Sequence, residues 1–244
     1  MNPEFKIVWD FHDQGEILLV DKPRDWSSFD VVKKIRSLFH VRKVGHAGTL
    51  DPNATGLLIV CTGKQTKKMS LFLDMEKEYE GSFLLGVRTP SCDSETEVSE
   101  RKDASLVTRE LLVATVKSFL GMQDQIPPMF SATKYGGAPL YLIARQGKTV
   151  ERASKEIDIK EFEILEYDQQ LVKFRIVCSK GTYIRTVVDD LGITLGCGAT
   201  LQDLRRIRTG PHSVRNAFSI EELIDLRDIL DRRQHRAYEV SAST

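Results

Sequence analysis

The chain has 244 residues, which is enough for one large domain or two small ones with a substantial core. Its 35 Lys and Arg residues balance 35 Asp and Glu residues, so the composition argues against a uniformly basic nucleic-acid binder. The four cysteines have no metal-ligand spacing, the N-terminus has no signal-peptide pattern, and no apolar run reaches membrane-spanning length. These features favour a cytoplasmic protein with reduced thiols.

The charges are unevenly distributed along the chain. Between Lys33 and Lys68, eight basic residues accompany a single acid, Asp51. Between Glu156 and Asp168 the balance reverses, with six acids and one base. A local basic patch can bind phosphates even when the total charge is zero.

The first third of the chain is predicted to form strands and helices around one glycine-rich turn. In chain order we predict a strand over Gly15–Val20, a helix over Phe29–Phe39, a buried strand over Leu57–Val60 and a short basic helix over Lys64–Leu73. Ser27 and Asp30 fit a capping box at the start of the first helix.

The rest of the chain mixes strands and helices without a regular βαβ alternation. We predict strands over Lys77–Thr89, Ile157–Tyr167 and Leu171–Cys178, a loop over Asp93–Asp103 and an extended basic segment over Leu204–Gly210. We predict helices over Thr108–Leu120, Leu140–Arg145 and Ser219–Leu230, and a further helix that opens within Ser179–Thr186 and runs through Leu195. This order favours the α+β class over a doubly wound α/β fold. The polar residues after Leu230 are expected to fray.

The stretch Lys43–Gly56 carries the strongest signal for chemistry. Its only carboxylate, Asp51, precedes Pro52, and a proline restricts the residue before it to extended or turn conformations. A lone acid on a rigid turn near His46 suits nucleophilic or general-base chemistry. The alternative is a surface turn whose Asp only caps a neighbouring group. The stretch lacks the Gly-Lys-Ser/Thr of a P-loop and the spacing of a dinucleotide-binding fingerprint.

The full motif shifts the balance towards chemistry. Gly-His-Ala-Gly-Thr-Leu-Asp-Pro at 45–52, followed by Ala-Thr-Gly at 54–56, resembles the catalytic motif of the TruB family of bacterial tRNA pseudouridine-55 synthases. Further blocks follow the family's order: Leu-Val-Asp-Lys-Pro at 19–23, Lys-Glu-Tyr at 77–79, Ser-Ala-x-Lys-Tyr at 131–135, Gly-Thr-Tyr-Ile-Arg at 181–185 and Leu-Arg-Arg at 204–206. Several blocks in one order are far more specific than any one alone. One departure is Asp25, which stands where the family usually has Gly.

The resemblance implies both a fold and an activity. The fold is the pseudouridine-synthase fold, with a long mixed or antiparallel central sheet flanked by helices and loops and a catalytic cleft across its middle. The activity is isomerisation of the T-loop uridine at position 55 of tRNA to pseudouridine, with base flipping and with no cofactor or metal. Two alternatives stay open: a non-catalytic tRNA-binding or tRNA-folding protein on the same scaffold, and a guide-RNA-dependent pseudouridylase.

The resemblance also assigns the site residues. Asp51 is the essential carboxylate, which attacks the base, attacks the sugar or removes a proton from the sugar. Arg185 is expected to pair with it, and Tyr79 to stack on the target base. The residues implied in substrate binding are His46, Leu204, Lys22, Lys134, Tyr183, Lys64, Arg205 and Arg206. For Tyr79 and Leu204 simple packing is the alternative, and for the basic residues a solvated surface position.

The domain organisation follows from the same comparison. Residues 1–230 are expected to form the catalytic domain, with an RNA-contacting insertion at 125–155. Residues 231–244 are expected to be a polar tail, and no C-terminal PUA domain is expected. The implied partner is the T-arm of tRNA, without a membrane and without an obligate protein partner.

Overall fold

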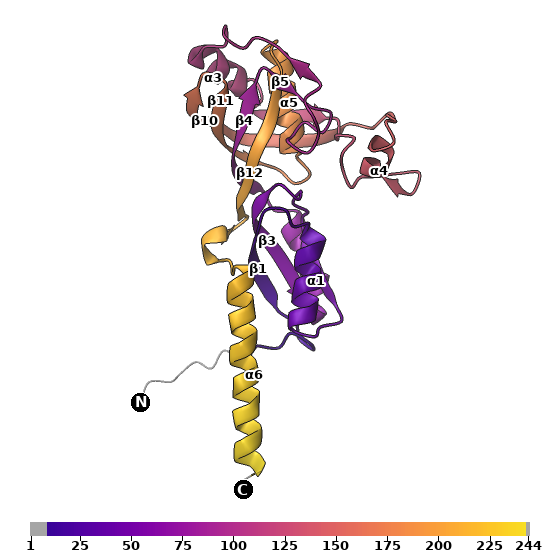
Figure 1. The fold of residues 1–244 in the computed structure, drawn as a ribbon, viewed down its shortest axis with the longest axis vertical. Helices are drawn as coiled ribbons and strands as arrows, with labels where there is room; N and C mark the ends of the chain where they lie inside the picture. The colour runs from indigo at the N-terminus through magenta and orange to yellow at the C-terminus, as the bar shows by residue number, and fades with distance from the viewer. Residues whose placement is uncertain (1–8, 243–244) are drawn as a thin grey trace. The chain divides into compact units, whose positions relative to one another are not determined.

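The computed structural model describes the backbone of residues 9–242 and the side chains up to Arg232 (Figure 1). The chain divides into two compact units, which are described one at a time. The first unit contains residues 1–74 and 208–244, and the second unit contains residues 75–207.

The first unit is built on the antiparallel strand pairs β1–β3 and β2–β3. Its elements are β1 (Ile17–Lys22), α1 (Ser28–Leu38), β2 (Val44–Ala47), β3 (Thr55–Thr62), the 3-10 helix η1 (Gly63–Lys68), α2 (Met69–Leu73), β13 (His212–Ser213), the 3-10 helix η2 (Val214–Asn216) and α6 (Ile220–Ala242). Strand β3 pairs antiparallel with β1, where Lys22 lies opposite Gly56, and with β2, where His46 lies opposite Val60.

The core of the first unit lies between these strands and α1, which runs alongside β1 and β3 (Figure 1). Most of its buried side chains come from β1, α1, β3 and α6: Leu18, Val20, Val31, Ile35, Leu58, Val60, Ile220 and Leu223. The helical spacing of the α1 members places them on one face. The predicted capping box is confirmed, because the Ser27 side chain accepts from Asp30 N and the Asp30 side chain accepts from Ser27 N.

The second unit is built on five neighbouring strands in the order β12-β4-β11-β10-β7. Its elements are β4 (Lys77–Leu85), β5 (Val87–Arg88), β6 (Glu100–Arg101), α3 (Arg109–Lys117), β7 (Gly121–Gln125), β8 (Lys134–Tyr135), β9 (Ala138–Pro139), α4 (Leu140–Ala144), β10 (Lys155–Asp168), β11 (Leu171–Cys178), α5 (Ile184–Thr194) and β12 (Ala199–Thr209). The pairs β4–β11, β11–β10 and β10–β7 are antiparallel. Helices α3 and α5 contact each other, and α3 packs on β10.

Strand β11 shows why the sequence folds this way. Val172, Phe174 and Ile176 are buried, whereas Lys173 and Arg175 between them are exposed or half-buried. Successive side chains of a strand point to opposite faces of the sheet, so this alternation places one apolar face on the core. A large sheet flanked by helices confirms the α+β class.

Several elements differ from the predictions. Strand β4 ends at Leu85 because Gly86 adopts a positive φ of 78°, and the predicted loop over 93–103 contains β6, which pairs with β5. Strand β7 was not predicted, since its sequence Gly-Met-Gln-Asp-Gln is polar. The predicted basic helix over 64–73 begins as the 3-10 helix η1.

The C-terminal helix also corrects a prediction. It was expected to end near Leu230 and to be followed by a fraying tail, but the backbone of α6 is helical to Ala242. None of the helices in the described part of the chain is long and apolar enough to cross a membrane.

Candidate active site

Asp51 lies in the loop that connects β2 to β3, and its side chain is half-buried. Gly48 and Gly56, near the two ends of this loop, have φ values of 93° and 100°, which glycine adopts without steric cost. The N–H of Ala54 donates to the carbonyl oxygen of Asp51 at 3.1 Å and closes a turn. The central motif therefore encodes a tight loop with the carboxylate at its middle.

The backbone is anchored on both sides of Asp51. On one side, the Ser28 hydroxyl accepts from Leu50 N at 2.8 Å and donates to Leu50 O at 3.1 Å. On the other side, Pro52 O accepts from Asp25 N at 3.0 Å and from Lys22 Nζ at 3.2 Å. The turn after β1 and the start of α1 thus hold the loop in place, which preorganises the carboxylate.

Lys22 was predicted to bind substrate, and its position corrects that prediction. The side chain is 0% exposed, and its ammonium also donates to Pro23 O at 2.9 Å and to Trp26 O at 2.5 Å. A group enclosed in this way has no surface for an RNA phosphate. Hydrogen bonds from a charged donor contribute about 1.5–3 kcal/mol each. Lys22 therefore stabilises the Asp51 loop through its bond to Pro52 O.

Asp25 has the unusual conformation that its sequence position suggested. Its φ is 65°, in the left-handed region that favours glycine but that Asp tolerates better than most residues. The turn that a glycine would form is therefore kept in this chain, and its N–H still reaches Pro52.

The other predicted residues of the first unit lie on different elements. His46 is half-buried and is the second-to-last residue of β2, just before the loop. Lys64 is exposed on η1. His46 is therefore close to Asp51 along the chain, and Lys64 is available to solvent.

In the second unit, Arg185 lies in the first turn of α5 and is 3% exposed. Its guanidinium donates to Ser91 O at 3.1 Å and to Phe130 O at 2.9 Å. Nε lies 3.5 Å from Oδ2 of Asp93, and these two side chains are only 4% and 8% exposed. The planar guanidinium suits several acceptors at once.

Asp93 was missed by the sequence reasoning, which treated it as the start of a polar loop. The loop is in fact tightly bonded: the carbonyl oxygen of Asp93 accepts from Thr89 Oγ1 at 2.7 Å and from Ser91 Oγ at 3.2 Å. The preceding Cys92 has a positive φ of 60°, and burial raises the pKa of its thiol to about 12. Asp93 is the carboxylate beside Arg185.

The remaining predicted residues of the second unit divide between its sheet and the segment between β7 and β10. Tyr79 lies on β4 opposite Ile176 and is 8% exposed, while Leu204 and Arg205 are half-buried on β12. Arg206 was predicted to contact phosphate but is 1% exposed, so it belongs to the interior. The strand alternation that buries Arg206 leaves its neighbour Arg205 partly accessible.

We call residues 126–154 the arm. It leaves the sheet after Gln125 and returns at Lys155, and it carries β8, β9 and α4 (Figure 1). Lys134 is exposed on β8. Tyr183, just before α5, contacts the arm, because its hydroxyl lies 3.0 Å from Thr133 Oγ1.

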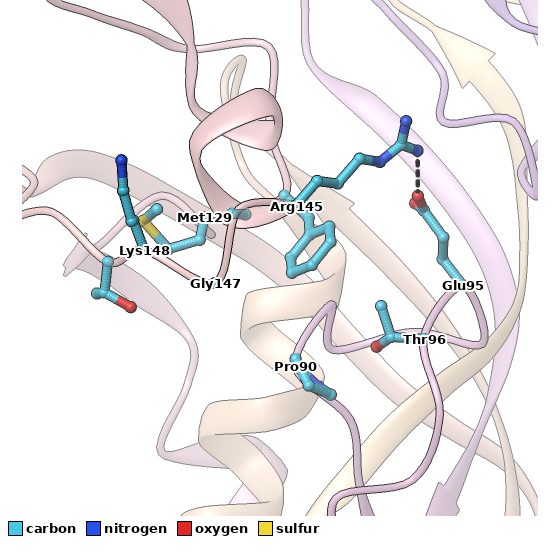
Figure 2. A pocket seen from close by; sticks show the side chains of 10 residues that line it. Pro90, Glu95, Thr96, Met129, Arg145, Gly147 and Lys148 are labelled. Atoms are coloured by element: carbon cyan, nitrogen blue, oxygen red, sulfur yellow. Dashed lines mark hydrogen bonds and ion pairs between the residues drawn. The ribbon is translucent and has the colours of Figure 1, made fainter.

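An open groove of about 820 Å³ lies between the arm and the Asp93 loop. Its lining residues are Pro90, Glu95, Thr96, Met129, Phe130, Ala144, Arg145, Gly147, Lys148 and Thr149. An ion pair of 2.9 Å between Arg145 and Glu95 joins the two walls (Figure 2). Apolar side chains beside basic ones suit a nucleotide, which presents a flat base and a phosphate.

The donor set of the site suits acid–base or nucleophilic chemistry. Within the described residues, no group of three or more His, Cys, Asp and Glu side chains could hold a metal ion. The first unit provides a carboxylate on a braced loop. The second unit provides a guanidinium beside a carboxylate of its own. An aromatic side chain that can hold a base lies on the sheet of the second unit.

Two solved structures have folds similar to that of this chain. The chain resembles a structure described as a Cbf5-Nop10-Gar1 complex, with a TM-score of 0.68 and 28% identity over 86% of this chain and 53% of that one. It also resembles an H/ACA RNP bound to a substrate RNA containing 2′-deoxyuridine, with a TM-score of 0.64, 27% identity, and coverage of 86% of this chain and 52% of that one. The chain spans about half the length of these two neighbours.

Sequence comparison gives the family. Residues 36–184 match the model of the TruB family pseudouridylate synthase N-terminal domain, and residues 185–238 match the tRNA pseudouridylate synthase B C-terminal domain. A tRNA pseudouridine synthase B from Chloroherpeton thalassium is 45% identical over 86% of this chain and 90% of the relative. One from Flavobacterium johnsoniae is 46% identical over 85% of this chain and 93% of the relative. The chain belongs to the TruB family of pseudouridylate synthases, which are isomerases.

Proposed function

We propose that the protein converts the uridine at position 55 in the T-loop of tRNA to pseudouridine. The observation that carries the proposal is the Asp51 loop, braced at Leu50 and Pro52, in a chain 45% identical to a protein named tRNA pseudouridine synthase B. A tRNA substrate also fits a cytoplasmic enzyme.

The reaction balances without an oxidant or a cofactor. The bond between C1′ of the sugar and N1 of uracil breaks, and a bond between C1′ and C5 forms. C5 loses a proton to the solvent, and N1 gains one. Asp51 acts either as a nucleophile towards the base or the sugar, or as the base that removes a sugar proton.

Arg185 and Tyr79 have supporting roles in this proposal. The guanidinium of Arg185, held by Asp93, stabilises the ionised form of a carboxylate that acts on the same nucleotide. Tyr79 stacks on the flipped uracil, whose extraction from the loop costs roughly a few kcal/mol. By the resemblance, Leu204 forms an apolar wall of the base pocket, and His46 occupies the space that the flipped-out nucleotide leaves.

The RNA is bound mainly through its phosphates and through the groove beside the arm. Exposed or half-buried basic residues available for this are Lys64, Lys134, Arg145, Lys148 and Arg205. Each neutralised phosphate releases counterions, so we expect tRNA affinity to fall steeply with salt although the net charge is zero. A flat salt response would contradict phosphate binding by these residues.

The likeness to structures of H/ACA particles favours one second candidate, a pseudouridylase that depends on a guide RNA. The two candidate functions differ in whether the enzyme needs a guide RNA. The decisive experiment incubates the purified protein alone with an unmodified tRNA transcript and maps pseudouridine along it. Modification at position 55 without another component supports the proposal, and modification only after a guide RNA is added supports the second candidate.

The footprint of recognition is tested by comparing substrates. We expect an isolated T-arm hairpin to be modified nearly as efficiently as full-length tRNA. The measurement is kcat/KM on both. A loss beyond about a hundredfold on the hairpin, roughly 2.7 kcal/mol of transition-state binding, would mean that contacts outside the T-arm are needed. The exposed arm would then be the first region to examine.

A further inference from the structure

Gln125 lies at the neck of the arm. It is the last residue of β7 and pairs with Lys155, the first residue of β10, so the chain leaves and re-enters the sheet at this pair. The residue is only 4% exposed. A buried amide that keeps its hydrogen bonds fixes the groups it contacts.

The amide of Gln125 binds both backbone polar groups of a single residue, Tyr183. Nε2 donates to Tyr183 O at 3.1 Å, and Oε1 accepts from Tyr183 N at 2.8 Å. Because the N–H and the C=O of Tyr183 belong to the peptide groups before and after its Cα, both peptide planes are held.

Tyr183 is the N-cap residue of α5, with φ −93° and ψ 104°, and its own side chain makes no capping hydrogen bond. Arg185 follows in the first turn. The direction of a helical side chain follows from the path of its backbone. The backbone of Tyr183 therefore sets the direction in which the guanidinium of Arg185 points.

The first residues of the arm, which follow Gln125, make two more hydrogen bonds to this turn. Phe130 O accepts from Arg185 at 2.9 Å, and Thr133 Oγ1 lies 3.0 Å from the hydroxyl of Tyr183. Gln125 and two residues of the arm, Phe130 and Thr133, are thus bonded to the start of α5. The glutamine at the neck is the only one of the three that holds the backbone of Tyr183 on both sides.

We propose that Gln125 is a positioning residue of the isomerisation, which keeps Arg185 in its working orientation by holding Tyr183. The inference rests on the proposed function, in which Arg185 acts on the target nucleotide. Gln125 does not touch the RNA. Its contribution is to the rate of the chemical step, and binding of tRNA does not depend on it.

The test replaces Gln125 by methionine, which has similar length but forms no such hydrogen bonds. Gln123→Met is the matched control, because Gln123 lies on the same strand and its amide also donates to a backbone carbonyl, Phe119 O at 2.6 Å, but not to α5. We expect Gln125→Met to lower the single-turnover rate at saturating enzyme by about tenfold or more, with the Kd for tRNA within threefold of wild type. Gln123→Met should change both by less than twofold.

Three results would overturn the proposal: a rate for Gln125→Met within twofold of wild type, an equal fall for Gln123→Met, or a weakened Kd with an unchanged rate. If Gln125→Met does not fold, Gln125→Glu keeps the acceptor for Tyr183 N–H and is measured in the same way. In an Arg185→Lys background, the Gln125 substitution should cost less than twofold. A fully active Arg185→Lys would instead refute the role of Arg185 in the proposed function. Failure of the Gln125 proposal is thereby distinguished from failure of the proposed function.

Discussion

Replacing Asp93 by asparagine tests the buried ion pair on which Arg185 depends. Nε of Arg185 and Oδ2 of Asp93 are 3.5 Å apart, and both side chains are less than a tenth exposed. Removing one partner of a buried pair typically costs about 3–5 kcal/mol, because a buried charge is left behind. Asparagine keeps an oxygen, and Ser91 O and Phe130 O still accept from Arg185, so we expect the lower value, about 3 kcal/mol.

The assay is thermal and urea unfolding combined with the single-turnover rate. For a chain of this size, about 3 kcal/mol corresponds to a fall in Tm of about 6–12 °C. Glu95→Gln is the matched control, since Glu95 lies in the same loop and pairs with Arg145, but these side chains are 36% and 62% exposed. Such a pair contributes about 0–1 kcal/mol.

A double-mutant cycle with Arg185→Met completes the test. We expect Asp93→Asn to cost much less in the Arg185→Met background, since the charge that it leaves unpaired is then absent. The reasoning is refuted if Asp93→Asn destabilises the protein no more than Glu95→Gln does, or if the effects of Asp93→Asn and Arg185→Met simply add.

The remaining predictions concern the Asp51 loop and the target base. Lys22→Met removes an ammonium that donates to three carbonyls. We therefore expect the free energy of unfolding in urea to fall by about 2 kcal/mol and the single-turnover rate to be slower. Wild-type values for both would contradict a supporting role of Lys22. Because Asp25 has a φ of 65°, Asp25→Gly should be more stable than Asp25→Ala by about 1 kcal/mol, and equal Tm values would count against this conformation. Tyr79→Phe should retain more activity than Tyr79→Leu if stacking is the main contribution, whereas equal defects in kcat would point to the hydroxyl.

Local rules predicted much of the fold. The capping box of α1 and the alternation of β11 depend on residues a few positions apart, so the sequence displays them directly. Strand β7 escaped prediction because its side chains are polar, and it is held by its pairing with β10. Its place at the edge of the sheet is a consequence of tertiary structure, which a pattern of hydrophobicity does not encode.

The residues of the candidate site likewise divide into those that local sequence predicts and those that depend on tertiary contacts. The motif around Asp51 predicts the carboxylate, whereas the roles proposed for Gln125 and Asp93 depend on contacts with residues far along the chain. Gln125 and Tyr183, for example, are 58 residues apart. Lys22 and Arg206, by contrast, were predicted to bind substrate. The resemblance assigned both to this role, yet both are buried, and burial depends on the packing of the whole unit.

The central claim is that the braced carboxylate of Asp51 performs the chemistry. The most direct measurement is pseudouridine formation by Asp51→Asn in a single-turnover assay with saturating enzyme and a full-length tRNA transcript, with tRNA affinity measured in parallel. Asparagine keeps the shape of the side chain and removes its charge, so the account predicts no detectable pseudouridine and a Kd close to that of wild type. A rate within about tenfold of wild type would contradict the assignment of Asp51 as the essential residue.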